Sequence, residues 1–185
     1  LTNRCTCACE FCIRKNTDTV GSAHSLWLER EPTREEVWLD IQSRNPEQYR
    51  ELVFCGFGEP TIRLNELLWV CKQFKAQYNL PVRVNTNGHA SLIAGQDVAP
   101  LFEGLVDVVS ISLNAKNAAE YSRICHPRDG EAAFDAMLDF ADKVKHFVPK
   151  VIMTVVDTMP AEDIEACRKI AESLGVSFRV RSYIA

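Results

Sequence analysis

Residues 52–60 read Leu-Val-Phe-Cys-Gly-Phe-Gly-Glu-Pro, an apolar run that stops at Gly56 and continues into a loop with a carboxylate. A short apolar run that ends at a glycine is typical of a buried strand, so we expect a strand over 52–55. Two glycines beside Glu59 let the backbone approach a ligand, and the carboxylate favours a cationic group. Taken alone, the loop is more typical of a tight turn in which Pro60 opens the next helix.

The same order of strand, polar loop and helix recurs along the chain. Further strands are predicted over 82–86, 106–113, 151–156 and 176–184, and a stub of strand is expected before Cys5. Helices are predicted over 33–44, 64–78, near 97–103, 116–124, 130–147 and 161–174, the first from a Thr33/Glu36 capping box. Alternating helices and continuous apolar strands indicate a parallel sheet flanked by helices. About six units are too few for an eight-fold barrel and fit a partial barrel or an open doubly wound sheet.

Composition describes an ordinary domain. The chain has 185 residues, 46% hydrophobic and 25% charged, which is enough for one substantial core, and we expect a single domain over 1–185, trimmed at its first strand. The net charge of −4 gives no global basic surface for nucleic acid and no evidence for DNA binding. No run is long enough to span a bilayer, and no leader precedes the first cysteine. Cys55, Cys71 and Cys167 lie within apolar runs and are expected to be reduced core residues, which favours the cytoplasm.

The densest group of cysteines lies in Thr-Asn-Arg-Cys-Thr-Cys-Ala-Cys-Glu-Phe-Cys-Ile-Arg at 2–14. Cys5, Cys9 and Cys12 have the spacing Cys-x-x-x-Cys-x-x-Cys, with Cys7 between them. Close thiolates on a short loop bind a metal or an iron-sulfur cluster, and an open fourth position makes such a site reactive. The four cysteines also fit a structural zinc site, although they do not form the two Cys-x-x-Cys pairs of a zinc ribbon. The cysteines alone leave both alternatives open.

Polar residues close the next two strands after residues 52–55. Asn-Thr-Asn-Gly stands at 85–88 and Ser-Ile-Ser-Leu-Asn-Ala at 110–115. In parallel α/β folds the loops after the strands meet at one edge, where ligands bind. Such residues also cap helices, so the position of each motif after its own strand is what favours a ligand site.

Together these segments resemble the radical SAM superfamily, in which SAM is S-adenosylmethionine. Its members have three cysteines at this spacing with an aromatic before the last, then Gly-Glu-Pro, Thr-Asn-Gly and Ser-Leu-Asp/Asn motifs. Phe57 replaces a more frequent glycine. The resemblance covers essentially the whole chain and implies a partial (β/α)6 barrel of parallel strands with helices on the outside. The chain looks most similar to the small radical SAM proteins associated with TatD-type nucleases, through residues 1–5, 12–14, 54–60 and 110–115.

The resemblance implies a 4Fe-4S cluster and SAM as cofactors. By that match Cys5, Cys9 and Cys12 bind three irons, SAM chelates the fourth, and Cys7 has no role. The residues carried over as SAM contacts are Phe11 near the adenine, Gly58 and Glu59 at the amino group, and Thr86, Asn87, Ser112 and Asn114 at the ribose and carboxylate. An electron donor such as flavodoxin or ferredoxin is an expected partner.

The implied reaction is reductive cleavage of SAM to a 5′-deoxyadenosyl radical, which abstracts hydrogen from an unidentified substrate. No acid-base catalytic residue is assigned. Several candidates for the substrate-facing wall are basic, which favours a small anionic substrate, although each alone is more typical of a solvated surface charge. These candidates are Arg14, Lys15, His24, Arg123, His126, Arg179 and Arg181. The last two share one face of a strand, whereas His89 and His146 are expected to be structural or exposed.

Two alternatives stay beside this hypothesis. The first is an activase or modifying enzyme that acts on a protein or RNA partner, because a partial barrel leaves one side open. The second, more remote, is a structural zinc-binding α/β module without catalysis.

Overall fold

The computed structural model describes residues 1–19 and 25–183, and within them five strands form one parallel sheet in the order β1-β2-β3-β4-β5. The strands are β1 (Leu52–Phe54), β2 (Val82–Thr86), β3 (Val108–Ser112), β4 (Lys150–Val156) and β5 (Ser177–Arg181). The predicted α/β class, with a parallel sheet and helices outside it, is confirmed.

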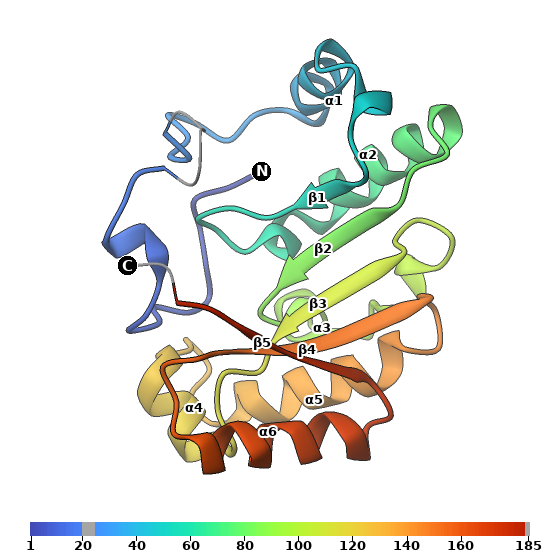
Figure 1. Ribbon diagram of the computed structural model, residues 1–185. Helices are drawn as coiled ribbons and strands as arrows, with labels where there is room; N and C mark the ends of the chain where they lie inside the picture. Colours follow the sequence, from blue (N-terminus) through green and yellow to red (C-terminus); the bar gives the residue numbers. More distant parts are fainter. Residues whose placement is uncertain (20–24, 184–185) are drawn as a thin grey trace.

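The helices connect the strands and lie along the outside of the curved sheet (Figure 1). They are α1 (Arg34–Ser43), α2 (Leu64–Gln77), α3 (Ala90–Ala94), α4 (Ala118–Cys125), α5 (Ala132–Val144) and α6 (Ala161–Ser173). Helix α1 begins with the predicted capping box, in which the Thr33 hydroxyl accepts from the Glu36 amide. No helix of the described residues has the length and apolar character of a membrane span.

One local expectation is confirmed and another is wrong. The short helix expected near 97–103 forms as a 3-10 helix, Ala99–Phe102, and a short helix that was not predicted, α3, lies earlier in the chain. The expected strand stub before Cys5 is not a strand, because the Arg4 carbonyl accepts from the Glu59 amide in the loop after β1 instead of from a neighbouring strand. The backbone of the N-terminal segment is thereby bound to a loop at the carboxyl end of the sheet.

The helix-facing side of the sheet forms the hydrophobic core. Val109 and Ile111 of β3 are fully buried, as are Met137 and Phe140 of α5. A Cβ at Gly88, whose φ is +82°, would lie 2.7 Å from the Met137 Cγ and 3.0 Å from the Ile111 Cγ2. Gly88 is therefore required both by its backbone conformation and by the close packing of the loop after β2.

The opposite side, called the inner face below, is polar toward the carboxyl ends of the strands. In register, Asn85 pairs with Ser110, Ser112 with Thr154, and Val156 with Arg181. Residues paired across parallel strands point to the same side, so these side chains share the inner face. Figure 1 shows the N-terminal segment beside the carboxyl ends of the strands, so this edge of the inner face is where a site can form.

Candidate functional site

The cysteine loop, residues 5–12, is attached to the end of α4 through its backbone. The Ala8 amide donates to the Cys125 carbonyl at 3.0 Å, and the Glu10 amide donates to the Ile124 carbonyl at 2.9 Å. The last carbonyls of a helix have no partner within the helix, so they are available to bind another segment. This attachment brings Cys9 and Cys125 together.

Gly58 allows the N-terminal segment to cross the loop after β1. A Cβ at this position would lie 2.1 Å from the Thr2 carbonyl oxygen and 2.7 Å from the Arg4 carbonyl oxygen. Such distances exclude any side chain. The close approach that the sequence suggested for a ligand is thus made first by the chain's own backbone.

All ten predicted metal and cofactor residues line a single hollow of about 290 Å³, the cysteine cavity. Its floor is the carboxyl edge of the sheet and one wall is the cysteine loop. The predicted residues that line it are Cys5, Cys9, Phe11, Cys12, Gly58, Glu59, Thr86, Asn87, Ser112 and Asn114. The motifs that the sequence separates by more than a hundred positions therefore meet in space.

The cysteines of the loop differ in their surroundings. Cys5, Cys9 and Cys12 are partly exposed, whereas Cys7 is 6% exposed, with its Sγ 3.8 Å from the Tyr121 hydroxyl. The Cys7 thiol and burial raise the pKa of Cys5, and the Cys125 thiol and burial raise the pKa of Cys9. These thiols therefore need a cation beside them to become thiolates at neutral pH.

The prediction that all three later cysteines are core residues is wrong for one of them. Cys71 and Cys167 are fully buried, but Cys55 is exposed and lines the cysteine cavity. It follows the last residue of β1, where the chain turns away from the helices, so an apolar run does not guarantee burial at its final position.

Glu59 is 3% exposed and accepts four hydrogen bonds from its neighbours. Its Oε1 accepts from the Thr61 amide, the Thr61 hydroxyl and the Thr86 hydroxyl, and its Oε2 accepts from the Asn87 amide. Burial raises the pKa of Glu59, and these donors oppose that shift by favouring the ionised form. Oε2, with one donor, has the greater remaining capacity to accept from a cationic group.

Thr86 and Asn87 line the cavity, but their polar atoms are already engaged. The Thr86 hydroxyl accepts from the Gly88 amide at 3.0 Å and donates to Glu59. The Asn87 Nδ2 donates to the Thr6 hydroxyl at 2.8 Å, and its Oδ1 accepts from the His89 amide. These two side chains hold Glu59 and the cysteine loop in place.

His89 is a member of the site region that the sequence did not single out. It is fully buried, with Nδ1 3.1 Å from the Thr6 hydroxyl and Nε2 3.1 Å from the Tyr121 hydroxyl. Burial lowers the pKa of His89 to about 4, so the ring is neutral at pH 7. The sequence signal was its position directly after Asn-Gly, although the pattern does not reveal a partner as distant as Tyr121; His146 is exposed, as expected.

Three buried side-chain nitrogen or oxygen atoms of the described residues have no hydrogen-bond partner, and all three belong to residues that line the cysteine cavity. They are Asn85 Oδ1, Asn114 Oδ1 and Arg181 Nε. Asn114 also has a φ of 53°, a left-handed conformation that asparagine tolerates better than most residues. Unpaired buried polar groups are costly, and their concentration in one cavity indicates a place for a polar ligand.

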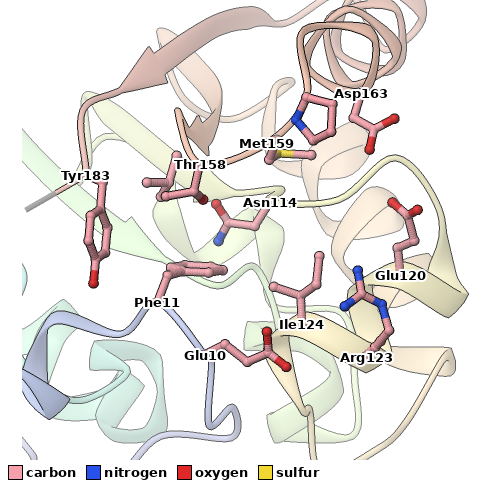
Figure 2. Close-up of a pocket in the computed structure, with 12 residues that line it drawn as sticks. Glu10, Phe11, Asn114, Glu120, Arg123, Ile124, Thr158, Met159, Asp163 and Tyr183 are labelled. Carbon is pink, nitrogen blue, oxygen red and sulfur yellow. The ribbon is translucent and has the colours of Figure 1, made fainter. Parts of the chain in front are cut away.

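A second hollow of about 430 Å³, the side cavity, adjoins the first (Figure 2). The two share Phe11, Asn114, Val156 and Tyr183. Figure 2 shows the Phe11 ring near the centre of the side cavity, with Tyr183 on one side and Arg123 on the other. The sequence assigned no role to Val156 or to the loop from Thr158 to Pro160, which completes this wall.

The candidate substrate-wall residues have different positions. Arg181 lines the cysteine cavity and Arg123 the side cavity, whereas Arg179 is exposed. Arg14 donates to the Asn3 and Phe57 carbonyls, and Lys15 to the Ala8 carbonyl, so both brace the cysteine loop. The exposed His126 lies 3.4 Å from Glu10, and His24 lies outside the described residues.

The donor set fits an iron-sulfur cluster better than a single ion. In residues 1–19 and 25–183, no three histidine, cysteine or acidic side chains converge on one point as ligands of one metal ion do. A four-iron cluster instead takes each thiolate on a different iron, so its cysteines surround a larger volume. Cys5, Cys9 and Cys12 line such a volume, beside unpaired polar atoms that suit a second, polar ligand.

Several solved structures share the fold of this chain. Streptococcus suis SuiB bound to precursor peptide SuiA matches with a TM-score of 0.68 at 14% identity, covering 99% of this chain and 38% of that one. A radical SAM methyltransferase from Sphaerobacter thermophilus matches at 0.67 and 15%, covering 97% and 63%. Methylornithine synthase matches at 0.62 and 14%, covering 98% and 51%. The chain therefore spans 38% to 63% of the length of these proteins, which is less than two thirds of each.

Sequence comparison names the family directly. The curated proteins contain no match to the chain. The family model described as the radical SAM superfamily matches residues 1–171, and one SuiB structure with this fold is bound to S-adenosylmethionine. The chain therefore belongs to the radical SAM superfamily, whose enzymes use a 4Fe-4S cluster and SAM.

Proposed function

We propose that residues 1–185 form the core domain of an enzyme that cleaves SAM reductively and uses the resulting radical on a small anionic substrate. The observation that carries the proposal is the meeting of Cys5, Cys9 and Cys12 with Ser112 and Asn114 in one cavity. The same cavity contains the unpaired polar atoms of the described residues.

In this proposal Cys5, Cys9 and Cys12 bind the cluster, and Cys7 does not. The three partly exposed thiols line the cavity from the loop side. Cys7 also lines this cavity, but it is more buried than the other three, and its sulfur contacts the Tyr121 hydroxyl and His89. Cys7 is therefore a wall residue that supports the loop.

SAM would extend from the cysteine cavity into the side cavity. The Glu59 carboxylate would bind its ammonium group through Oε2, and Ser112 and Asn114 would donate to or accept from its polar groups. Phe11 lines both hollows, so its ring is suited to pack against the adenine. Thr86 and Asn87 act indirectly, because they fix Glu59 and the cysteine loop.

A cluster held by Cys5, Cys9 and Cys12 would, when reduced by one electron, supply the cleavage of SAM to methionine and a 5′-deoxyadenosyl radical that takes a hydrogen atom from the substrate. The protein's own residues bind and orient the reactants and exclude water from them. Enzymes of this superfamily need a reductant; a flavodoxin or ferredoxin would deliver the electron here, in a cytoplasm that keeps the thiols reduced.

A macromolecular substrate is the second candidate. The SuiB structure contains a bound precursor peptide, and the inner face of this chain is open at β5, where Arg179 is exposed. A peptide that stimulates formation of 5′-deoxyadenosine when small acids do not would favour this candidate. The finer resemblance to the radical SAM proteins associated with TatD-type nucleases stays a prediction from residues 1–5, 12–14, 54–60 and 110–115.

The test is anaerobic reconstitution of single cysteine variants, with iron and acid-labile sulfide counted per chain. Alanine at Cys5, Cys9 or Cys12 is expected to remove the brown four-iron cluster and all 5′-deoxyadenosine formed with dithionite. Cys7→Ala is the matched control in the same loop and should keep most of its iron, because its sulfur faces Tyr121.

Two results would overturn the proposal. Stoichiometric zinc without iron in the native protein would make the site structural. Loss of iron in Cys7→Ala as complete as in Cys9→Ala would show that the ligand set is wrong.

A further inference from the structure

Two arginines of the inner face, Arg83 and Arg181, differ in their electrostatic surroundings. Arg83 of β2 is neutralised by Glu51, which accepts hydrogen bonds at 2.6, 2.7 and 3.0 Å. Arg181 lies at the carboxyl end of β5, in the wall of the cysteine cavity, and its buried Nε has no partner. The structure thus pairs Arg83 with a carboxylate, whereas the Nε of Arg181, in the cavity wall, has no hydrogen-bond partner among the described residues.

The surroundings of Arg181 contain no compensating charge. Burial and the like charge of Arg179 lower the pKa of Arg181, and no carboxylate of residues 1–19 and 25–183 offsets them. Arg181 is partly buried, and a buried Nε–H without an acceptor is unfavourable. An anionic ligand in the cavity would remove this penalty.

Asn85 supplies the second unpaired group. Its Oδ1 is buried without a donor, and the residue lines the same cavity from β2. This atom accepts hydrogen bonds and does not donate them, so it requires an N–H or O–H group. The two orphaned atoms therefore call for one ligand with both an anion and a donor.

Resting on the proposed function, we propose that Arg181 and Asn85 bind the substrate, and that this substrate is an organic acid whose carboxylate lies near an amino or hydroxyl group. The guanidinium pairs with the carboxylate through parallel hydrogen bonds, and Asn85 accepts from the amino or hydroxyl group. A carboxylate suits the cavity better than a phosphate, because one cation balances one charge and Glu59 is also negative there.

This placement puts the substrate across the inner face from the cysteine loop. The side cavity, which adjoins the same space, leaves room for the adenosyl part of SAM. Arg181 and Asn85 are then binding residues for the substrate, while the cysteines and Glu59 serve the cofactors.

The test uses the reconstituted enzyme with saturating SAM, so that the amino-acid end of SAM fills its own subsite. Glycine and acetate, at matched ionic strength, are titrated as probes by saturation-transfer NMR. Glycine should bind more tightly than acetate. Arg181→Gln should weaken both at least tenfold, and Arg181→Lys should restore part of the loss. Asn85→Leu should weaken glycine about fivefold and leave acetate unchanged.

Arg179→Gln is the matched control, since Arg179 shares the strand and the face but is exposed, and it should change neither affinity. Unchanged glycine and acetate binding in Arg181→Gln would refute the proposal. A tenfold loss of SAM affinity in that variant, or displacement of both probes by SAM, would assign Arg181 to the carboxylate of SAM instead. Failure of the proposed function would appear separately, as absence of iron or of 5′-deoxyadenosine in the native enzyme.

Discussion

Along β3, successive side chains enter two different environments. Val109 and Ile111 point toward the helices and are fully buried among apolar groups, whereas Ser110 and Ser112 point to the inner face. Ser110 is only 4% exposed, so burial alone does not distinguish the two faces. What differs is chemistry: the outer face is apolar and internally complete, while the inner face keeps unpaired polar atoms at its carboxyl edge. Because successive side chains of a strand point to opposite faces, the outer face contributes mainly to stability and the inner face is available for ligand binding.

The strongest test of this separation is a cavity in the outer face. Phe140 is fully buried on α5, and its ring packs edge-on against that of Phe102 with the ring centroids 5.6 Å apart. Phe140→Ala should lower the free energy of unfolding by about 4 kcal/mol, measured by urea denaturation, because large apolar truncations leave a void. The folded variant should keep its iron content and SAM affinity.

Leu39→Ala is the control for that variant, since Leu39 is 64% exposed and should change stability by less than about 0.5 kcal/mol. A Phe140→Ala protein that is folded but has lost SAM binding would show that the two faces are not independent.

A smaller change in stability is expected from the protonation of His89. This residue is as buried as the side chains of the outer face, but it lies beside the cysteine loop. Its pKa is about 4 when folded, against an ordinary value of 6.5. Between these values the unfolded chain binds a proton that the folded chain does not, so stability should fall by about 3 kcal/mol as pH drops from 6.5 to 4. Urea denaturation of the native protein and His89→Gln at pH 7, 5.5 and 4.5 measures this difference.

The histidine variant should show a shallower loss of stability with acid than the native protein. His146→Gln, which removes an exposed histidine, should keep the native slope. Equal slopes for the native protein and His89→Gln would mean that His89 is not the buried neutral group.

The smallest expected effect lies on the inner face. Ser112→Ala should leave stability within about 0.5 kcal/mol and weaken SAM binding two- to tenfold, the cost of one hydrogen bond. Calorimetry of the reconstituted native protein and of the variant measures the SAM affinity of each. Ser110→Ala, two residues earlier on the same face but not part of the cavity wall, should bind SAM normally. Equal weakening by both variants would contradict the placement of SAM at the carboxyl edge.

Much of the fold could be predicted because its signals are local. The capping box at Thr33 and the apolar run of β4 depend on neighbours in the chain, and both elements form within a residue of where they were expected. The expected strand before Cys5 failed because its backbone bonds are decided by residue 59, far along the chain. The burial predicted for Cys55 failed because this residue follows the end of β1 and lines the cysteine cavity instead of the core.

The sequence predicted which residues line the candidate site, but not which of them contact one another and which are left to bind a ligand. Motif order placed Thr86 and Ser112 together, and both line the cavity. That the Thr86 hydroxyl would bond to Glu59 depends on side-chain geometry across strands, which no spacing encodes. The unpaired state of the Arg181 Nε is likewise a property of the assembled cavity, since the other strand residues that line this cavity come from β2, β3 and β4.

The docking of the cysteine loop also orders events during folding. Cys7 and Tyr121, which meet in the finished protein, are 114 positions apart in sequence. Contacts of such separation carry a large loop-closure entropy and form late, after the local strand and helix pairs. The sheet can then assemble while the three cysteines are still accessible. A protein that delivers the cluster would therefore meet a folded sheet and accessible thiols, before the cysteine loop packs onto α4.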